Sequence, residues 1–252
     1  MNTESDTSNG VQFEGKETYV KDVFTEIASY YDEMNEIMTM GMVQGWHKFL
    51  LDKAGDFTGK KCLDIGTGTG ELAFLDAERA GPDGEVIGVD ITPKMLEFAE
   101  IKMKALDLPK DVVFEEGDAL NLKYEDNSFD IVSSGYMLRN VTDVQQAIDE
   151  MYRVLKVGGK FVVADLGQPD NRVVHYFYKW YMKHRVTKMG RKYDKGKVID
   201  GKVPAYDWLT SSVVGFPHGK EMTAKFMAAG FKDAKFCTKT FGAVYFYYGT
   251  KE

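Results

Sequence analysis

Two polar residues stand side by side where an apolar segment ends. Arg139 and Asn140 follow the run "FDIVSSG" at 129–135, which has the composition of a buried strand. A guanidinium keeps its charge up to a pH above ~12, so Arg139 can stabilise a negative charge but cannot accept a proton. Three explanations are open for the pair: the start of a helix, a structural ion pair with a carboxylate, or a part in a reaction.

A second candidate for chemistry is the glycine-rich segment "LDIGTGTGEL". Asp64 is followed by Gly66, Gly68 and Gly70, and a helix-like run comes next. Alternating glycines allow a sharp turn and a close approach of a ligand to the backbone. The spacing differs from the dinucleotide fingerprint, and Glu71 would repel a pyrophosphate at the helix start. We therefore expect a cofactor without phosphates, rather than NAD or an ordinary tight turn.

Acidic residues end the next two predicted strands. Asp90 closes "EVIGVD", 20 residues after Gly70, where it can accept hydrogen bonds from both hydroxyls of a ribose. Asp118 closes "VVFEEGD" and could accept from an adenine amino group, with Ala119 leaving space for the ring. Together the strand ends predict an adenosine pocket without a phosphate cradle, which indicates S-adenosylmethionine (SAM).

These residues need a scaffold that brings strand ends together, and the chain alternates strand-like and helix-like segments. Strands are predicted at 60–66, 85–90, 112–118, 129–135 and 158–167, and helices at 71–81, 92–106 and 142–156. This alternation predicts an α/β fold with a Rossmann-like, doubly wound sheet. Such a sheet binds its ligand at the carboxyl ends of its strands, where the candidate residues fall.

The flanking segments depart from this alternation. We predict a disordered tail at 1–16, a helical cap at 17–54, an aromatic and basic helix at 173–189 and a loop at 190–205, followed by a helix at 220–230 and antiparallel strands at 235–241 and 243–251. Residues 17–252 are expected to form one domain, in which 171–217 is an aromatic insertion on the substrate side.

Composition limits the class of protein. With 32 Lys and Arg against 39 Asp and Glu, the net charge is −7, which argues against nucleic acid as a partner. The two cysteines, Cys62 and Cys237, suggest neither a metal site nor a disulfide framework and are compatible with the cytoplasm. We find no signal peptide and no apolar run of ~18 residues, so we expect a cytoplasmic protein that at most rests on the inner face of a membrane.

Across nearly the whole chain beyond the tail, the sequence resembles the class I SAM-dependent methyltransferases, and more closely the ubiquinone/menaquinone biosynthesis C-methyltransferases. The matching segments are "VFTEIASYYDEMNEIMTMG" (23–41), "LDIGTGTGEL" (63–72), "LRNVTD" (138–143), "MYRVLKVGGK" (151–160), "YDWLTSSVVGFP" (206–217) and "AGFKDAKF" (229–236). The resemblance implies a seven-stranded, mostly parallel sheet with an antiparallel last strand. It also implies methyl transfer from SAM to a ring carbon of a polyprenylated quinol.

The resemblance, with the strand ends, assigns site residues. Expected cofactor contacts are Tyr31, Asp64, Gly66, Thr67, Gly68, Thr69, Gly70, Asp90, Ile91, Met95, Gly117, Asp118, Ala119 and Gly135. Expected substrate contacts are Tyr136, Met137 and Tyr178, and no metal is expected. In this assignment Arg139 favours the phenolate form of the acceptor and Asn140 orients it. Apart from the resemblance, if the reaction uses a conventional base, His175 is the first choice among the histidines and His47 the second.

The sequence departs from the family pattern near the expected acceptor. Met137 stands where the family usually has Gly, Gln44 where it has a basic residue, and Asp165 and Gln168 where it has Glu and Lys. The alternatives are therefore a methyltransferase of another small hydrophobic phenol or carbon acid, or an inactive SAM-binding subunit. The aromatic helix could pack on the sheet, line the acceptor pocket or rest on anionic lipid. A homodimer is also considered.

Overall fold

The computed structural model describes residues 11–252, which form a seven-stranded sheet in the order β3-β2-β1-β4-β5-β7-β6. The strands are β1 (Lys61–Ile65), β2 (Glu85–Asp90), β3 (Val113–Glu116), β4 (Phe129–Gly135), β5 (Leu155–Leu166), β6 (Lys235–Lys239) and β7 (Val244–Thr250). Only β7 runs antiparallel to its neighbours β5 and β6. The predicted Rossmann-like sheet with an antiparallel last strand is confirmed.

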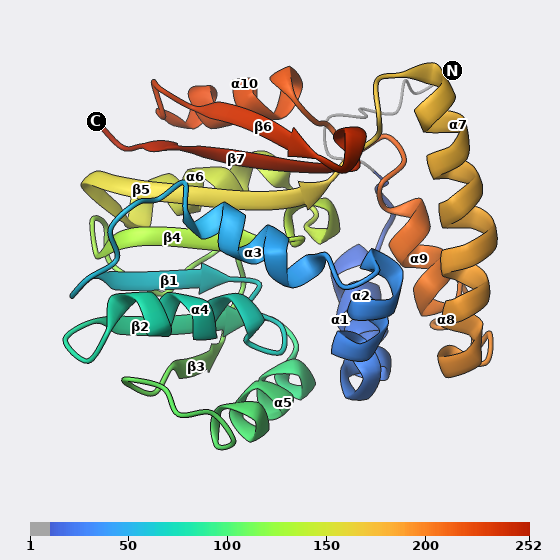
Figure 1. The fold of residues 1–252 in the computed structure, drawn as a ribbon, viewed down its shortest axis with the longest axis horizontal. Coiled ribbons are helices and arrows are strands. Elements are labelled where there is room, and N and C mark those ends of the chain that lie inside the picture. Colours follow the sequence, from blue (N-terminus) through green and yellow to red (C-terminus); the bar gives the residue numbers. More distant parts are fainter. Residues whose placement is uncertain (1–10) are drawn as a thin grey trace.

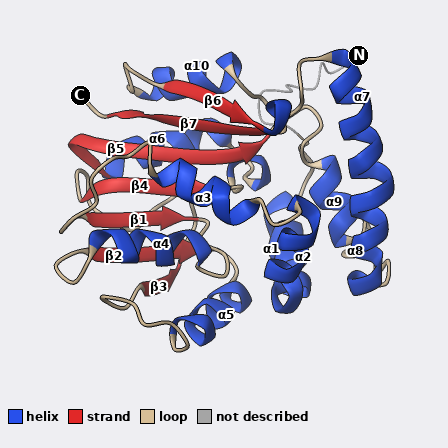
Figure 2. Ribbon diagram, in the orientation of Figure 1, coloured by secondary structure: helices blue, strands red, loops and turns tan. Residues whose placement is uncertain are grey.

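Helices cover both faces of the sheet and one of its ends (Figures 1 and 2). They are α1 (Lys16–Ile27), α2 (Tyr31–Thr39), α3 (Val43–Leu51), α4 (Glu71–Ala80), α5 (Pro93–Met103), α6 (Val144–Val154), α7 (Arg172–Tyr181), α8 (Thr187–Asp194), α9 (Ala205–Ser211) and α10 (Lys220–Ala229). One core lies between the sheet and α3 and α4, and another between the sheet and α6 and α10. None of the helices in the described part of the chain is long and apolar enough to cross a bilayer.

The remaining helices gather at the carboxyl ends of the parallel strands. Figure 1 places α1, α2, α7, α8 and α9 together on that side. A third core joins them, built around Tyr19, Tyr206 and Trp208. The rings of Tyr19 and Trp208 meet edge to face with centroids 5.4 Å apart. The expected cap thus packs against the aromatic insertion above the strand ends.

The predicted loop at 190–205 is wrong for its first five residues and for its last, because Ala205 begins α9. The helical course of α7 continues through a π-helical turn, Met182–Val186, into α8, which ends at Asp194. Gly190 allows this packing, because a Cβ there would lie 2.1 Å from Cγ of Tyr206. Buried Asp194 accepts hydrogen bonds from the backbone N–H groups of Gly196 and Tyr206. Lysines made this segment resemble a loop, but they lie on its exposed side.

The predicted tail is partly outside the described residues, since 1–10 are not described. Residues 11–16 contact the domain instead of leaving it. The ring of Phe13 lies 5.6 Å from that of Tyr19 and 5.8 Å from that of Trp208. Lys16 is 1 % exposed and donates to the carbonyl oxygens of Val141 (2.7 Å) and Arg139 (3.4 Å). Burial lowers the pKa of this ammonium to about 8.

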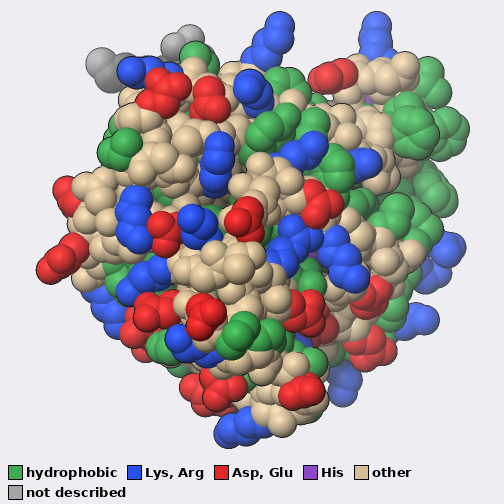
Figure 3. Space-filling model, turned by 60° about the vertical axis from the view of Figure 1, so that its left-hand side comes forward, with side chains coloured by type: hydrophobic (Ala, Val, Ile, Leu, Met, Phe, Trp, Pro, Cys, Tyr) green, Lys and Arg blue, Asp and Glu red, His purple; other side chains and the backbone are tan. Residues whose placement is uncertain are grey.

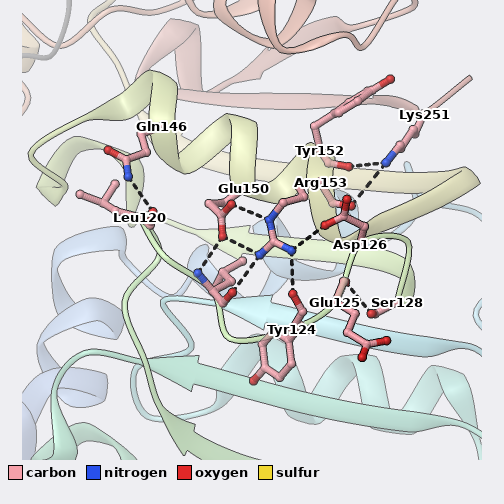
Figure 4. Close-up of polar contacts among 11 residues, drawn as sticks. Leu120, Tyr124, Glu125, Asp126, Ser128, Gln146, Glu150, Tyr152, Arg153 and Lys251 are labelled. Carbon is pink, nitrogen blue, oxygen red and sulfur yellow. Dashed lines mark hydrogen bonds and ion pairs between the residues drawn. The ribbon is translucent and has the colours of Figure 1, made fainter.

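An arginine fixes the segment that precedes β4 onto α6 (Figure 4). Arg153 donates to the carbonyl oxygens of Leu122 and Tyr124 and to the carboxylates of Glu150 and Asp126. Ion pairing raises the pKa of Arg153 and lowers that of Glu150. These contacts fix the start of β4, and therefore the position of the residues that follow its carboxyl end.

Candidate active site

The glycine loop between β1 and α4 adopts a conformation that side chains would block. Gly66, Gly68 and Gly70 have φ of 72°, 56° and 86°, in the left-handed region. A Cβ on Gly66 would lie 2.4 Å from Cγ of Met137. The carboxylate of Asp90 holds the loop, because it accepts a hydrogen bond from the N–H of Gly68 at 2.9 Å.

A small cavity of about 100 Å³ lies over this loop. Ten of the fourteen predicted cofactor contacts line it: Tyr31, Gly66, Gly68, Asp90, Ile91, Met95, Gly117, Asp118, Ala119 and Gly135. Among the described residues that line it, none is Lys or Arg, whereas Glu17, Asp90 and Asp118 are acidic. A cavity with carboxylates and no cation fits a cationic nucleoside without phosphates, which is the chemistry of SAM.

The four other predicted contacts lie elsewhere. Asp64, Thr67 and Thr69 line a second, larger cavity, and Gly70 lines neither cavity but caps α4. The prediction missed Glu17, Val20 and Phe24 of α1, which close the small cavity from the cap side. Their spacing of three and four residues on one helix face was the available signal.

The larger cavity, about 360 Å³, adjoins the small one and is mostly apolar. Both are lined by Tyr31, Gly66, Gly68, Gly135 and Tyr136. The larger one extends between α2, α3, α7 and the turn before β7. Its apolar lining includes Met38, Met40, Met42, Val43, Trp46, Leu72, Leu166, Val174, Phe177, Tyr181, Met182, Val186, Leu209, Phe241, Ala243 and Val244.

The turn after β4 separates the two cavities and is held under strain. Tyr136 has φ 61°, a left-handed conformation that costs on the order of 1 kcal/mol in a residue of this kind. Its N–H donates to the carbonyl oxygen of Ala164 at 2.7 Å. Its own carbonyl oxygen accepts from Nη1 of Arg139 and from Nδ2 of Asn140. Such strain persists where the surroundings enforce it, commonly at functional sites.

Arg139 forms a buried ion pair with Asp165 of β5. Nη1 of Arg139 lies 2.8 Å from Oδ1 of Asp165, and the two side chains are 5 % and 1 % exposed. The backbone N–H of Arg139 also donates to this carboxylate, at 3.1 Å. Burial raises the pKa of Asp165, and the guanidinium opposes that shift. Arg139 is thus a structural anchor and, at the same time, part of the wall of the larger cavity.

Apart from Asp64 and Thr67 at the glycine loop, four residues that line the larger cavity each bury a polar atom without a hydrogen-bond partner. These atoms are Nδ1 of His47, Oη of Tyr136, Nε of Arg139 and Oη of Tyr178. Leaving such an atom unpaired costs about 1–3 kcal/mol, so unpaired atoms concentrated in one apolar cavity indicate a polar ligand. Burial raises the pKa of Tyr178 to about 12, with Arg139 opposing the shift, so its hydroxyl stays protonated as a donor.

Several predicted substrate-side residues lie away from this cavity. Met137 and Asn140 line the small cavity, where Met137 packs on Gly66. His175 lines neither cavity, although it is on α7, so it is not placed to take a proton from a bound group. Gln44 also lines neither and donates to Glu71. His47, the second choice for the base, does line the larger cavity.

An ion cluster fastens the cap to the glycine loop. Lys102 of α5 pairs with Asp32 of α2 at 2.8 Å and with Glu71 of α4. The hydroxyl of Thr69 donates to the same Asp32 carboxylate. Lys102 lowers the pKa of Glu71 against the effect of burial. Thr69 and Glu71 line the larger cavity, so the cluster ties α2 to the glycine loop beside that cavity.

Two fully buried carboxyl groups share a serine beneath the loop. The hydroxyl of Ser133 lies 2.7 Å from Oδ2 of Asp76 and 3.4 Å from Oδ1 of Asp64. Neither aspartate has exposed area, and each has one oxygen without a partner. Burial raises the pKa of Asp64 to about 7, and burial with the neighbouring Asp64 raises that of Asp76. The pair therefore holds at least one proton near neutral pH.

The sheet order, the glycine loop and the phosphate-free nucleoside cavity define the class as SAM-dependent methyltransferases. A SAM-dependent methyltransferase structure from Aquifex aeolicus superposes with a TM-score of 0.59 at 16 % identity, covering 88 % of this chain and 98 % of that one. The chain belongs to the ubiE/COQ5 methyltransferase family, whose profile matches residues 12–251.

Two curated relatives are similar over almost their full length. A demethylmenaquinone methyltransferase of Symbiobacterium thermophilum is 34 % identical, covering 94 % of both chains. A ubiquinone/menaquinone biosynthesis C-methyltransferase UbiE of Idiomarina loihiensis is 32 % identical, covering 94 % of this chain and 92 % of the relative. The prediction of a SAM-dependent methyltransferase from this family is confirmed.

Replacement of Asp76 should change how stability depends on pH. Asp64 and Asp76 bind protons more tightly in the folded chain than the ~3.9 of an unfolded aspartate. The contribution of these two protonated carboxyl groups to the free energy of unfolding is therefore full below about pH 4. It is lost as the pH rises through their folded-state pKa, which is about 7 for Asp64. Asp76→Asn should be the more stable protein at pH 8, by on the order of 1 kcal/mol, with the difference vanishing toward pH 4.

Urea unfolding at several pH values measures this difference. Asp83→Asn, in an exposed turn, is the matched control and should show no such trend. A difference between Asp76→Asn and wild type that stays constant from pH 5 to pH 8 would contradict the shared proton.

Proposed function

We propose that this protein transfers a methyl group from SAM to a ring carbon of a polyprenylated quinol. One observation carries the proposal: residues with unpaired buried polar atoms line a mostly apolar cavity that adjoins the SAM cavity. A hydroxylated aromatic ring supplies partners for those atoms and apolar area for the rest. The names of the curated relatives, which act on demethylmenaquinone or in ubiquinone and menaquinone biosynthesis, support the same acceptor class.

The opening of the larger cavity suits the tail of such an acceptor. Met40, Phe177 and Phe241 all line the cavity, yet they are 72 %, 62 % and 84 % exposed. Large apolar side chains at a cavity mouth are unfavourable in water unless a partner covers them. In our proposal the prenyl tail leaves between them while the ring lies at the inner end.

Each residue at the inner end has a proposed part. SAM, when bound, supplies a methyl group whose C–S bond breaks with both electrons staying on sulfur. Arg139 stabilises negative charge on the acceptor oxygen, because its charge is fixed and its Nε is unpaired. Tyr178 donates a hydrogen bond and places the ring. Asn140, which lines the small cavity, orients the cofactor rather than the phenol.

Incubation with labelled SAM tests the acceptor class. The panel holds demethylated naphthoquinols and benzoquinols with short prenyl tails, kept reduced, beside simple phenols of similar size. We expect label on a ring carbon of the quinols, located by mass spectrometry of the product. Label found only in the simple phenols would contradict the quinol assignment and favour the alternative acceptor.

The charge of Arg139 is best tested together with its partner. Arg139→Gln alone would leave Asp165 buried and unpaired, which costs about 3–5 kcal/mol and could unfold the protein. We therefore choose the double variant Arg139→Gln/Asp165→Asn. It should fold and bind SAM within about threefold of wild type, while kcat falls about 10²–10³-fold.

Calorimetric SAM titration and initial rates measure the two effects. Arg191→Gln/Asp207→Asn removes a partly exposed ion pair of the same kind and should behave as wild type. A double variant at 139 and 165 that keeps wild-type turnover would exclude an electrostatic part for Arg139.

We also propose that α7 rests on the anionic cytoplasmic face of a membrane, from which the quinol enters. Val173, Tyr176, Phe177 and Trp180 follow helical spacing and are 48–68 % exposed. In a chain of net charge −7, residues 172–195 hold one acidic residue and eight exposed basic ones: Arg172, Lys179, Lys183, Arg185, Lys188, Arg191, Lys192 and Lys195. In Figure 3, hydrophobic side chains gather along the right-hand edge beside Lys and Arg. Aromatic and basic side chains together suit an anionic bilayer surface.

Vesicle co-sedimentation tests the membrane contact. Wild type should bind phosphatidylcholine vesicles at least tenfold better when they contain phosphatidylglycerol, since each basic residue near the surface contributes ~1 kcal/mol. Tyr176→Glu/Trp180→Glu should lose this binding. The control Ile101→Glu/Leu106→Glu introduces the same charge at exposed apolar positions elsewhere and should retain it. Equal binding by both double variants would contradict contact through α7.

A further inference from the structure

His47 is a buried imidazole that faces the larger cavity. It lies on α3, is 7 % exposed, and its Nδ1 has no hydrogen-bond partner. Burial lowers its pKa to about 4, so the ring is neutral and able to accept a proton at physiological pH. A neutral acceptor held in the apolar wall, beside a cavity that fits a phenol, has no structural partner to explain it.

The charged groups around His47 belong to three other helices. Glu71 of α4 and Asp32 of α2 raise its pKa, and Lys102 of α5 lowers it. Because Lys102 is paired with both carboxylates, the imidazole faces a partly neutralised cluster. The nearest ring is that of Tyr136, with centroids 5.9 Å apart, and its hydroxyl is also unpaired. His47 and Tyr136 thus approach the place where both cavities meet.

We propose that His47 is the catalytic base, accepting the proton of the acceptor's hydroxyl during methylation; this rests on the proposed function. The O–H bond breaks, an N–H bond forms on the imidazole, and the electron pair left on oxygen forms a carbonyl as the ring carbon gains its methyl group. The methylated carbon then loses its hydrogen as a proton to water. Loss of that hydrogen restores the aromatic ring as a phenolate, whose oxygen recovers the proton from the imidazolium.

A weakly basic imidazole suits this step. A phenol has a pKa near ~10, so His47 would not ionise it before the reaction. Once the ring carbon carries the methyl group, the same O–H is that of a protonated carbonyl, which is far more acidic than an imidazolium. A base whose pKa lies between these limits accepts the proton as the carbon–carbon bond forms.

His47→Gln tests the proposal, since glutamine can form hydrogen bonds but cannot take the proton. Reduced 1,4-dihydroxynaphthalene serves as acceptor and labelled SAM as donor. We expect kcat to fall about 10²-fold or more, with the Kd of SAM and the KM of the acceptor within about threefold of wild type. The control is His184→Gln, at an exposed histidine 3.1 Å from the carbonyl oxygen of Trp180, which should match wild type. A His47→Gln enzyme with wild-type kcat would overturn the proposal.

Histidine NMR gives a readout that needs no turnover. In ¹³C-histidine-labelled protein without SAM, 1-naphthol should displace the His47 resonance, which His47→Gln identifies, and leave that of His184 unchanged. An unmoved His47 resonance with naphthol bound overturns the inference even where quinols are methylated. A displaced resonance without methylation of any quinol or phenol would sink the proposed function while supporting contact of His47 with a phenol.

Discussion

The buried ion pair between Arg139 and Asp165 is the interaction on which the site depends. Asp165 lies at the end of β5 and accepts from both the side chain and the backbone of Arg139, which fixes the turn after β4. That turn contains Tyr136 in a left-handed conformation that would otherwise relax. Lys16 holds the other side of the turn by donating to its carbonyl oxygens. Together these contacts hold the wall between the two cavities in place.

The position of that wall decides which groups can meet. Gly66 and Gly68 on one strand end, and Gly135 and Tyr136 on the next, border both cavities. A cofactor in the small cavity and a ring in the larger one can therefore approach only there. When the enzyme holds the cofactor and the ring in one geometry, their reaction becomes effectively unimolecular. Rigidity at this border therefore contributes directly to the rate of methyl transfer. The strained backbone of Tyr136 is compatible with such rigidity, because packed neighbours on both sides hold it in the left-handed conformation.

The sequence predicted what local chemistry dictates. Glycines and aspartates at strand ends identified the cofactor side, because the order of strands and helices brings those ends together. It could not predict the orientation of side chains within one short turn. In the turn after β4, Tyr136 and Arg139 face the larger cavity, whereas Met137 and Asn140 face only the small one. Nor could the sequence show that His47, and not His175, lines the larger cavity. That difference arises from how α3 and α7 pack against the strand ends.

The unpaired groups of the larger cavity connect stability with selectivity. Nδ1 of His47, Nε of Arg139 and the hydroxyls of Tyr136 and Tyr178 are desolvated without partners. Each such atom costs about 1–3 kcal/mol in the unliganded protein. A ring with hydroxyl groups removes part of that cost on binding, whereas a hydrocarbon ring of equal size leaves it in place. Sites built to hydrogen-bond a hydroxyl reject analogues without it by about 10⁴–10⁵-fold, far more than apolar fit alone achieves. Discrimination between hydroxylated and plain rings should therefore reside in these four groups, and discrimination between tails in the exposed apolar mouth.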